Sequence, residues 1–185
     1  MTLPAMYASL AMEPGPKMLV EGLSMYGLME VRGGGINKTI VAWADEVAAA
    51  VPTPYANWAA DFYNDDKIPW CALWMAVLSV RAGRQPPAKY LSAREWLNYG
   101  VPVTVAMLGD VLVFSRDGGA HVALYVGEDD HYYHILGGNQ GDAVNIMRKR
   151  KTDCIGIRRP AYKQTPFNVR RVFFGATGAV SSNEA

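Results

Sequence analysis

The stretch Ile68-Pro69-Trp70-Cys71-Ala72-Leu73-Trp74 decides how the fold of this chain is interpreted. The polar run before it, residues 64–67, favours a turn, and Pro69 interrupts any helix that reaches it. Residues 72–81 are almost entirely apolar and predict a buried helix. We therefore expect Cys71 at the amino-terminal end of this helix, where unpaired N–H groups and the helix dipole stabilise a thiolate.

The chain before this helix is expected to be mainly helical. Asn37 predicts the N-cap of a helix over residues 38–50, which the prolines that follow bring to an end. Residues 18–29 also have helix-compatible apolar spacing, and they break at a run of three glycines. Residues 1–18 contain three prolines and are expected to form an extended arm.

The chain after residue 101 changes to an alternating apolar pattern, which predicts β-strands. Helices first and an antiparallel meander afterwards indicate an α+β fold, with N-terminal helices packed on a C-terminal antiparallel sheet of about five to six strands. We expect one domain over residues 19–160, followed by a polar tail over residues 161–185. The predicted strands cover residues 109–114, 121–126, 131–136, 144–147 and 155–158.

Composition limits the classes of function. The chain has 185 residues, half of them hydrophobic, and a net charge of +1, so its charge gives no argument for binding nucleic acid. Two cysteines without CxxC spacing and three histidines without HExxH spacing predict neither a metal site nor a cofactor. No apolar run reaches transmembrane length and no signal peptide is apparent, so we expect synthesis in a cytoplasm without membrane insertion.

A cysteine and a histidine together suggest the chemistry. His121 lies in the predicted strand 121–126, and a helix-borne Cys71 facing a strand-borne histidine is the arrangement that a cysteine hydrolase needs. Cys71 would be the nucleophile and His121 the general base. His131 lies in a predicted turn and is expected to be exposed, whereas His134 lies on the strand that follows.

Two residues compete to be the polar group that orients His121. Asn139 can accept the imidazole N–H and hold the ring in the tautomer that faces sulfur, and His134 is the alternative. An odd number of positions separates the two, so on a regular strand only one of them faces His121. Gly137-Gly138 can carry a bulge that changes this parity, and the sequence leaves the choice open.

Several motifs in fixed order resemble a known family. They are Pro69-Trp70-Cys71-Ala72, Ala93-Arg94-Glu95-Trp96-Leu97-Asn98-Tyr99-Gly100, Gly109-Asp110-Val111, His121-Val122-Ala123-Leu124-Tyr125-Val126-Gly127 and Leu136-Gly137-Gly138-Asn139-Gln140. In these the chain resembles the papain-like cell-wall hydrolases of the NlpC and CHAP superfamily, over about residues 19–160. More closely, it is similar to a phage- and prophage-encoded group with Trp-Cys and Gly-Gly-Asn-Gln motifs. It departs at Ala120, where the group usually has glycine.

The resemblance implies a papain-like fold and a peptidoglycan hydrolase that cleaves an amide bond of the cell wall. It implies the catalytic set Cys71, His121 and Asn139, with His134 as the alternative third residue. Trp70, Tyr63 and Gln140 are expected to bind substrate, whereas Trp74 and Trp96 are expected in the core.

The place of action also follows from the resemblance. The protein would be a phage-type endolysin that acts in the periplasm or cell wall, or a lysin carried in a phage particle. Two alternatives remain at this point: a non-catalytic tail or structural component with the same fold, and a cysteine amidase or toxin that acts on another amide.

Overall fold

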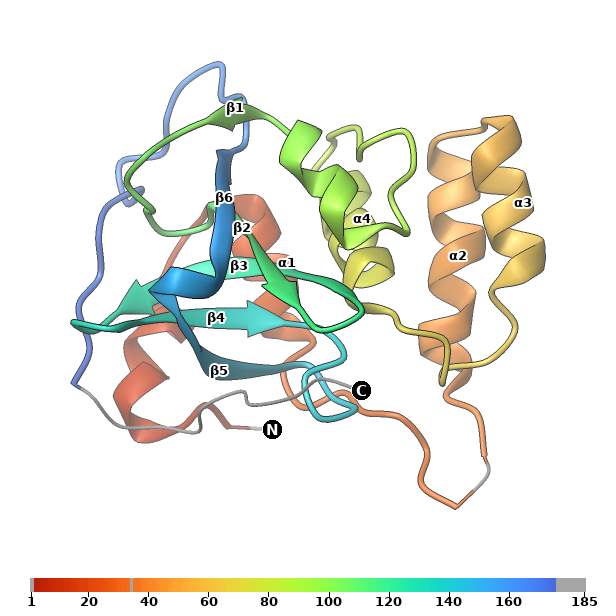
Figure 1. Cartoon of the computed structure of the whole chain (residues 1–185), viewed down its shortest axis with the longest axis horizontal. Helices are drawn as coiled ribbons and strands as arrows, with labels where there is room; N and C mark the ends of the chain where they lie inside the picture. Colours follow the sequence, from red (N-terminus) through yellow and green to blue (C-terminus); the bar gives the residue numbers. More distant parts are fainter. Residues whose placement is uncertain (1, 34, 176–185) are drawn as a thin grey trace.

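The computed structural model describes residues 2–33 and 35–175 and has the expected α+β architecture (Figure 1). Its strands form one antiparallel sheet in the order β1-β6-β2-β3-β4-β5. The prediction of five to six antiparallel strands after the helices is therefore confirmed. The strands are β1 (Val101–Pro102), β2 (Val111–Arg116), β3 (Gly119–Glu128), β4 (Tyr132–Gly137), β5 (Asn145–Arg150) and β6 (Cys154–Arg159).

The helices precede most of the sheet in the chain. The α-helices are α1 (Lys17–Ser24), α2 (Lys38–Ala50), α3 (Pro54–Phe62) and α4 (Cys71–Arg81), and the 3-10 helices are η1 (Ala5–Met12), η2 (Ala93–Asn98) and η3 (Lys151–Asp153). Helix α2 has the predicted bounds because Asn37 Oδ1 accepts a hydrogen bond of 3.0 Å from Thr39 N. None of the helices in the described ranges has the length and apolar composition that a membrane span requires.

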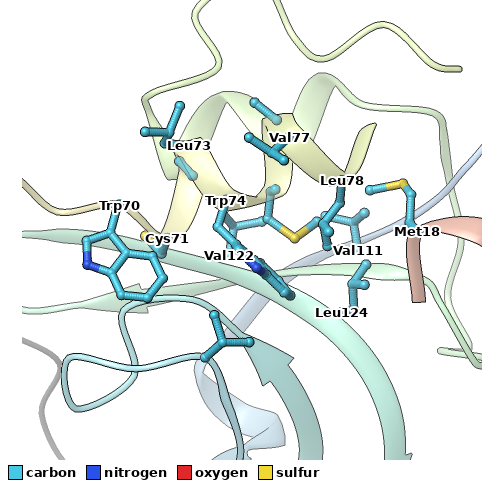
Figure 2. Close-up of a cluster of buried hydrophobic side chains, with 14 of the residues drawn as sticks. Met18, Trp70, Cys71, Leu73, Trp74, Val77, Leu78, Val111, Val122 and Leu124 are labelled. Atoms are coloured by element: carbon cyan, nitrogen blue, oxygen red, sulfur yellow. The ribbon is translucent and has the colours of Figure 1, made fainter. Parts of the chain in front are cut away.

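Helix α4 is the centre of the molecule. It packs against β3 and β4 on one side and against α2 on the other, and α2 pairs with α3 (Figure 1). Trp74 of α4 is fully buried and lies among the apolar side chains of α1 and the sheet, including Met18, Val122 and Leu124 (Figure 2). The core positions expected for Trp74 and Trp96 are confirmed, because both side chains are 0% exposed.

The amino-terminal residues are not the extended arm that the prolines predicted. They form η1, whose Tyr7 and Leu10 are buried in the core. Pro4 precedes η1 and Pro16 caps α1, so these prolines lie just before helices, where their missing N–H groups cost nothing.

Part of the predicted carboxy-terminal tail also packs on the sheet. Glu128 N donates to Val172 O and Phe174 N donates to Glu128 O, each over 2.9 Å. Residues 172–174 therefore lie beside the end of β3, where Glu128 and Phe173 form a parallel bridge. The expected tail beyond residue 175 lies outside the described residues.

Candidate active site

Cys71 is the first residue of α4, as the sequence predicted. Trp70 precedes it in non-helical conformation, and the Cys71 side chain is largely buried. Cys71 lines a cavity of about 310 Å³ together with residues 91–94 and with Gly119 and Ala120 of β3. The cavity therefore joins the start of α4 to the start of the strand that carries His121.

Two buried aromatic side chains fix the segment before Cys71. Trp70 Nε1 donates to Glu30 Oε1 over 2.7 Å, and Tyr63 Oη donates to Ile68 O over 2.5 Å. Both aromatic side chains are at most 1% exposed. The expectation that Trp70 and Tyr63 line a substrate groove is therefore wrong: they are buried, and they support the Cys71 position from the inside.

Tyr63 also lies within electrostatic reach of Cys71. Burial raises the pKa of Tyr63 far above its usual value, and the negative charge of a Cys71 thiolate raises it further. Burial likewise raises the pKa of Glu30 and outweighs the hydrogen bond from Trp70, which lowers it. Tyr63 therefore stays protonated near neutral pH and keeps its hydrogen bond to Ile68 O.

His121 lies in β3 between Ala120 and Val122, two residues on the side of the strand that is near α4. Ala120 lines the Cys71 cavity, and Val122 belongs to the core cluster around α4. The His121 side chain is 1% exposed, and its Nε2 lies 3.1 Å from Oε1 of the fully buried Gln140. The structure therefore brings His121 to the Gly-Gly-Asn-Gln segment, as expected, but through Gln140.

The orientation of the Gln140 amide follows from its other partners. Gln140 Nε2 donates to the backbone oxygen of Asn145 over 2.8 Å, and Asn145 Nδ2 donates to the backbone oxygen of Gln140 over 2.6 Å. A backbone carbonyl only accepts, so Oε1 must be the atom that faces His121. His121 Nε2 must then carry a proton, and in the neutral ring Nδ1 is the basic nitrogen.

The two glycines of the motif let this loop approach α4. A Cβ atom at Gly138 would lie 2.7 Å from the Trp70 ring and 2.8 Å from Trp74 Cβ. A Cβ atom at Gly137 would lie 2.7 Å from Gln140 Oε1. The glycine pair thus gives the loop room to rest on the start of α4 while the Gln140 side chain reaches His121.

Asn139 has a backbone role in the same loop. Its φ angle is 54°, in the left-handed region that asparagine tolerates better than most other side chains. The parity argument that compared Asn139 with His134 fails because β4 ends at Gly137, and the chain then turns away from strand geometry. It is the next residue, Gln140, that contacts the His121 ring. Sequence reasoning gave Gln140 a substrate-binding role that its complete burial does not allow.

His134 belongs to a different cluster. It pairs in the sheet with Gly127, six residues beyond His121 along β3. Its Nδ1 lies 2.7 Å from Tyr7 Oη and its Nε2 lies 3.1 Å from Asp129 Oδ2. Both ring nitrogens therefore have partners away from His121, and the structure gives no support to His134 as the orienting residue. His131 is exposed, as predicted.

Comparisons with known proteins do not assign this chain to a family. No family model matches the chain, and no curated protein matches it either. Within the described residues, His, Cys, Asp and Glu side chains form no group of three or more that could hold a metal ion.

Proposed function

We propose that the protein is a cysteine hydrolase that cleaves an amide bond of peptidoglycan. Cys71 is the nucleophile, His121 the general base and Gln140 the residue that orients His121. The observation that carries the proposal is the fixed Gln140 amide, because it selects the His121 tautomer with a basic Nδ1. A strand histidine with a fixed tautomer and a cysteine at a helix start are the two groups that nucleophilic catalysis by a thiolate requires.

In the proposed mechanism, His121 Nδ1 takes the proton of the Cys71 thiol. The thiolate sulfur attacks the amide carbonyl, and N–H groups at the start of α4 stabilise the oxyanion. The imidazolium then protonates the leaving amine as the C–N bond breaks. Water, deprotonated by His121, releases the acyl group from sulfur and restores the thiol. Gln140 Oε1 accepts the Nε2 proton throughout and stabilises the imidazolium.

The substrate class rests on the motifs rather than on the geometry. The Pro-Trp-Cys-Ala and Gly-Gly-Asn-Gln segments resemble those of phage-type cell-wall hydrolases, and we carry over peptidoglycan as the substrate on that basis. We further propose that the protein acts on the wall as an endolysin or as part of a phage particle. The enzyme is favoured over a tail component without turnover because the histidine that Gln140 orients directly follows Ala120, which lines the cavity at Cys71.

Mass spectrometry of fragments released from purified peptidoglycan tests this function. Wild type should release stem peptides from glycan if it is an amidase, or cut within peptides if it is an endopeptidase. Cys71→Ala should release nothing while its circular dichroism stays unchanged.

The control is Cys154→Ala. Cys154 lies in β6, and burial raises the pKa of its thiol, so this variant should stay active. Equal release by wild type and Cys71→Ala would overturn the cysteine mechanism, and no release by wild type would favour the structural component or another amide substrate.

A further inference from the structure

The charged side chains that line the cavity at Cys71 are all basic. Its charged lining residues are Arg94 and Arg116, Ser92 adds a hydroxyl, and no acidic side chain is among the described residues that line it. Arginine and serine both donate hydrogen bonds, and the guanidinium group is always charged near neutral pH. The part of a substrate that enters beside Cys71 therefore meets a donor-rich, cationic wall.

The two arginines approach from different elements. Arg94 belongs to η2 and is exposed, whereas Arg116 ends β2 and is partly buried. The segment that carries Arg94 is anchored because Trp96 Nε1 donates to Tyr90 O over 3.1 Å. The neighbouring carboxylate of Glu95 accepts a hydrogen bond from Asn98 Nδ2. The backbone that carries Arg94 is thus anchored, and the two arginines reach the cavity from η2 and β2.

We propose that Arg94, together with Ser92 and Arg116, binds a carboxylate that the substrate carries next to the scissile amide. This proposal rests on the hydrolase function proposed above and names its substrate class: peptides with a free carboxylate beside the bond that is cut. A guanidinium fork matches a carboxylate in a bidentate way, and both partners of the pair are charged. The neutral carboxamide of the same peptide keeps the shape but loses the charge that the fork recognises.

A second role for the same arginines predicts a different result. Positive charge beside Cys71 could act on the thiolate alone, in which case removing it would raise the pH at which activity appears, for every substrate alike. Recognition of a substrate carboxylate instead makes the effect of Arg94 depend on whether that carboxylate is present. The two roles can therefore be separated by pairing a variant with a change in the substrate.

The experiment compares soluble muropeptides that carry either a free carboxylate or a carboxamide next to each candidate amide. Wild type should cleave the carboxylate form with a kcat/KM about 10- to 100-fold higher, mostly through KM. Arg94→Gln should lose this preference and keep its rate on the carboxamide form. Arg150→Gln, which removes an exposed arginine outside the cavity, should behave like wild type. Equal losses by Arg94→Gln on both substrates would overturn the carboxylate subsite.

Binding to the Cys71→Ala variant keeps the test independent of turnover. Calorimetry should show that Cys71→Ala binds the carboxylate form more tightly and that adding Arg94→Gln abolishes the difference. If binding shows this preference but wild type cleaves neither peptide, the subsite stands and the hydrolase function fails. If wild type cleaves both forms equally, the function stands and the subsite fails. If neither peptide binds or is cleaved, both proposals fail.

Discussion

His121 and His134 are buried histidines on neighbouring strands, and they have opposite environments. His121 Nε2 donates to a neutral amide, Gln140, and the residue before it opens onto the Cys71 cavity. His134 lies between Tyr7 and Asp129, and Asp129 also pairs with Arg148 Nη2 at 2.7 Å. Phe174 packs on both the Tyr7 and His134 rings. His121 is the histidine to which we assign proton transfer, whereas His134 connects η1, β4 and the segment that carries Phe174.

The partners decide which of these roles a histidine can have. Burial raises the pKa of Tyr7 to about 12, so its hydroxyl stays protonated and donates to His134 Nδ1. His134 Nε2 then carries the ring proton and donates to Asp129. The same Nε2–H tautomer occurs in both histidines, but at His134 the basic Nδ1 is covered by a donor. A buried histidine on a strand is therefore not by itself a catalytic signal.

The largest expected effect separates the two histidines by activity. His121→Ala should lower turnover by at least about 10³-fold, because the proposed mechanism loses both its base and its acid. His134→Ala should retain most of the activity per folded molecule. Release of muropeptides at equal concentrations of folded protein measures both. Comparable activity of the two variants would show that His121 is not the base.

The two histidine variants should rank in the opposite order in stability, with His134→Ala losing more than His121→Ala. His134→Ala should lower the free energy of unfolding by about 2–4 kcal/mol, because it leaves Tyr7 Oη and the buried Asp129 carboxylate without their imidazole partner and opens a cavity. Urea unfolding followed by circular dichroism measures this loss. A loss smaller than that of His121→Ala would contradict the structural role given to His134.

Removing the orienting residue Gln140 should lower the rate less than removing His121 does. Gln140→Ala should lower kcat by about 10- to 100-fold, because His121 loses the acceptor that fixes its tautomer. Asn139→Gly is the matched control, since glycine adopts the φ of 54° without strain and Asn139 supplies backbone geometry. A larger loss in Asn139→Gly than in Gln140→Ala would restore Asn139 as the third catalytic residue.

The pH dependence of stability should also distinguish the two histidines. Burial lowers the pKa of His134 below its usual value, and Asp129 opposes this only in part. The unfolded chain then binds a proton more readily than the folded one, so stability is lost as the pH falls below about 6.5. His134→Gln should remove this part of the curve. The difference in unfolding free energy between wild type and His134→Gln, measured from pH 7.5 to pH 5, should shrink towards acid pH.

Asp129 contributes to the pH dependence of stability at a lower pH than His134 does. Burial raises the pKa of Asp129, but hydrogen bonds from His131 N, His134, Tyr132 N and Arg148 outweigh burial and hold it below its usual range. Its stabilisation is present above about pH 4 and is lost as the pH falls towards the lowered pKa. The His134 loss should therefore precede the Asp129 loss during acidification, and the reverse order would contradict the assigned pKa directions.

The sequence predicted those elements whose signals are local. Helix α2 has its expected bounds because the cap at Asn37 lies directly before it. Helix α4 begins at Cys71 because apolar residues follow Pro69 and Trp70 without interruption. The central strands lie where alternation placed them, and Cys71 lies at the predicted helix start. These features depend on neighbouring residues alone.

The features that the sequence missed depend on distant contacts. Ser92 and Glu95 have the spacing of a capping box, yet η2 has no side-chain cap. The burial of Tyr7 in η1 depends on His134 and Phe174, which lie far along the chain. Gln140 could be distinguished from Asn139 only by the turn after Gly137, whose course depends on contact with Trp70 and Trp74. The spacing of residues along the chain does not reveal such contacts.

The cluster of Tyr7, His134 and Phe174 also sets an order of events during synthesis. Tyr7 leaves the ribosome early, yet the ring that covers it lies at position 174. The amino-terminal residues must therefore wait, without their final neighbour, until nearly the whole described chain has been made. During that interval the apolar side of η1 is open to chaperones and proteases, so the yield of native protein should depend on how fast translation reaches residue 174.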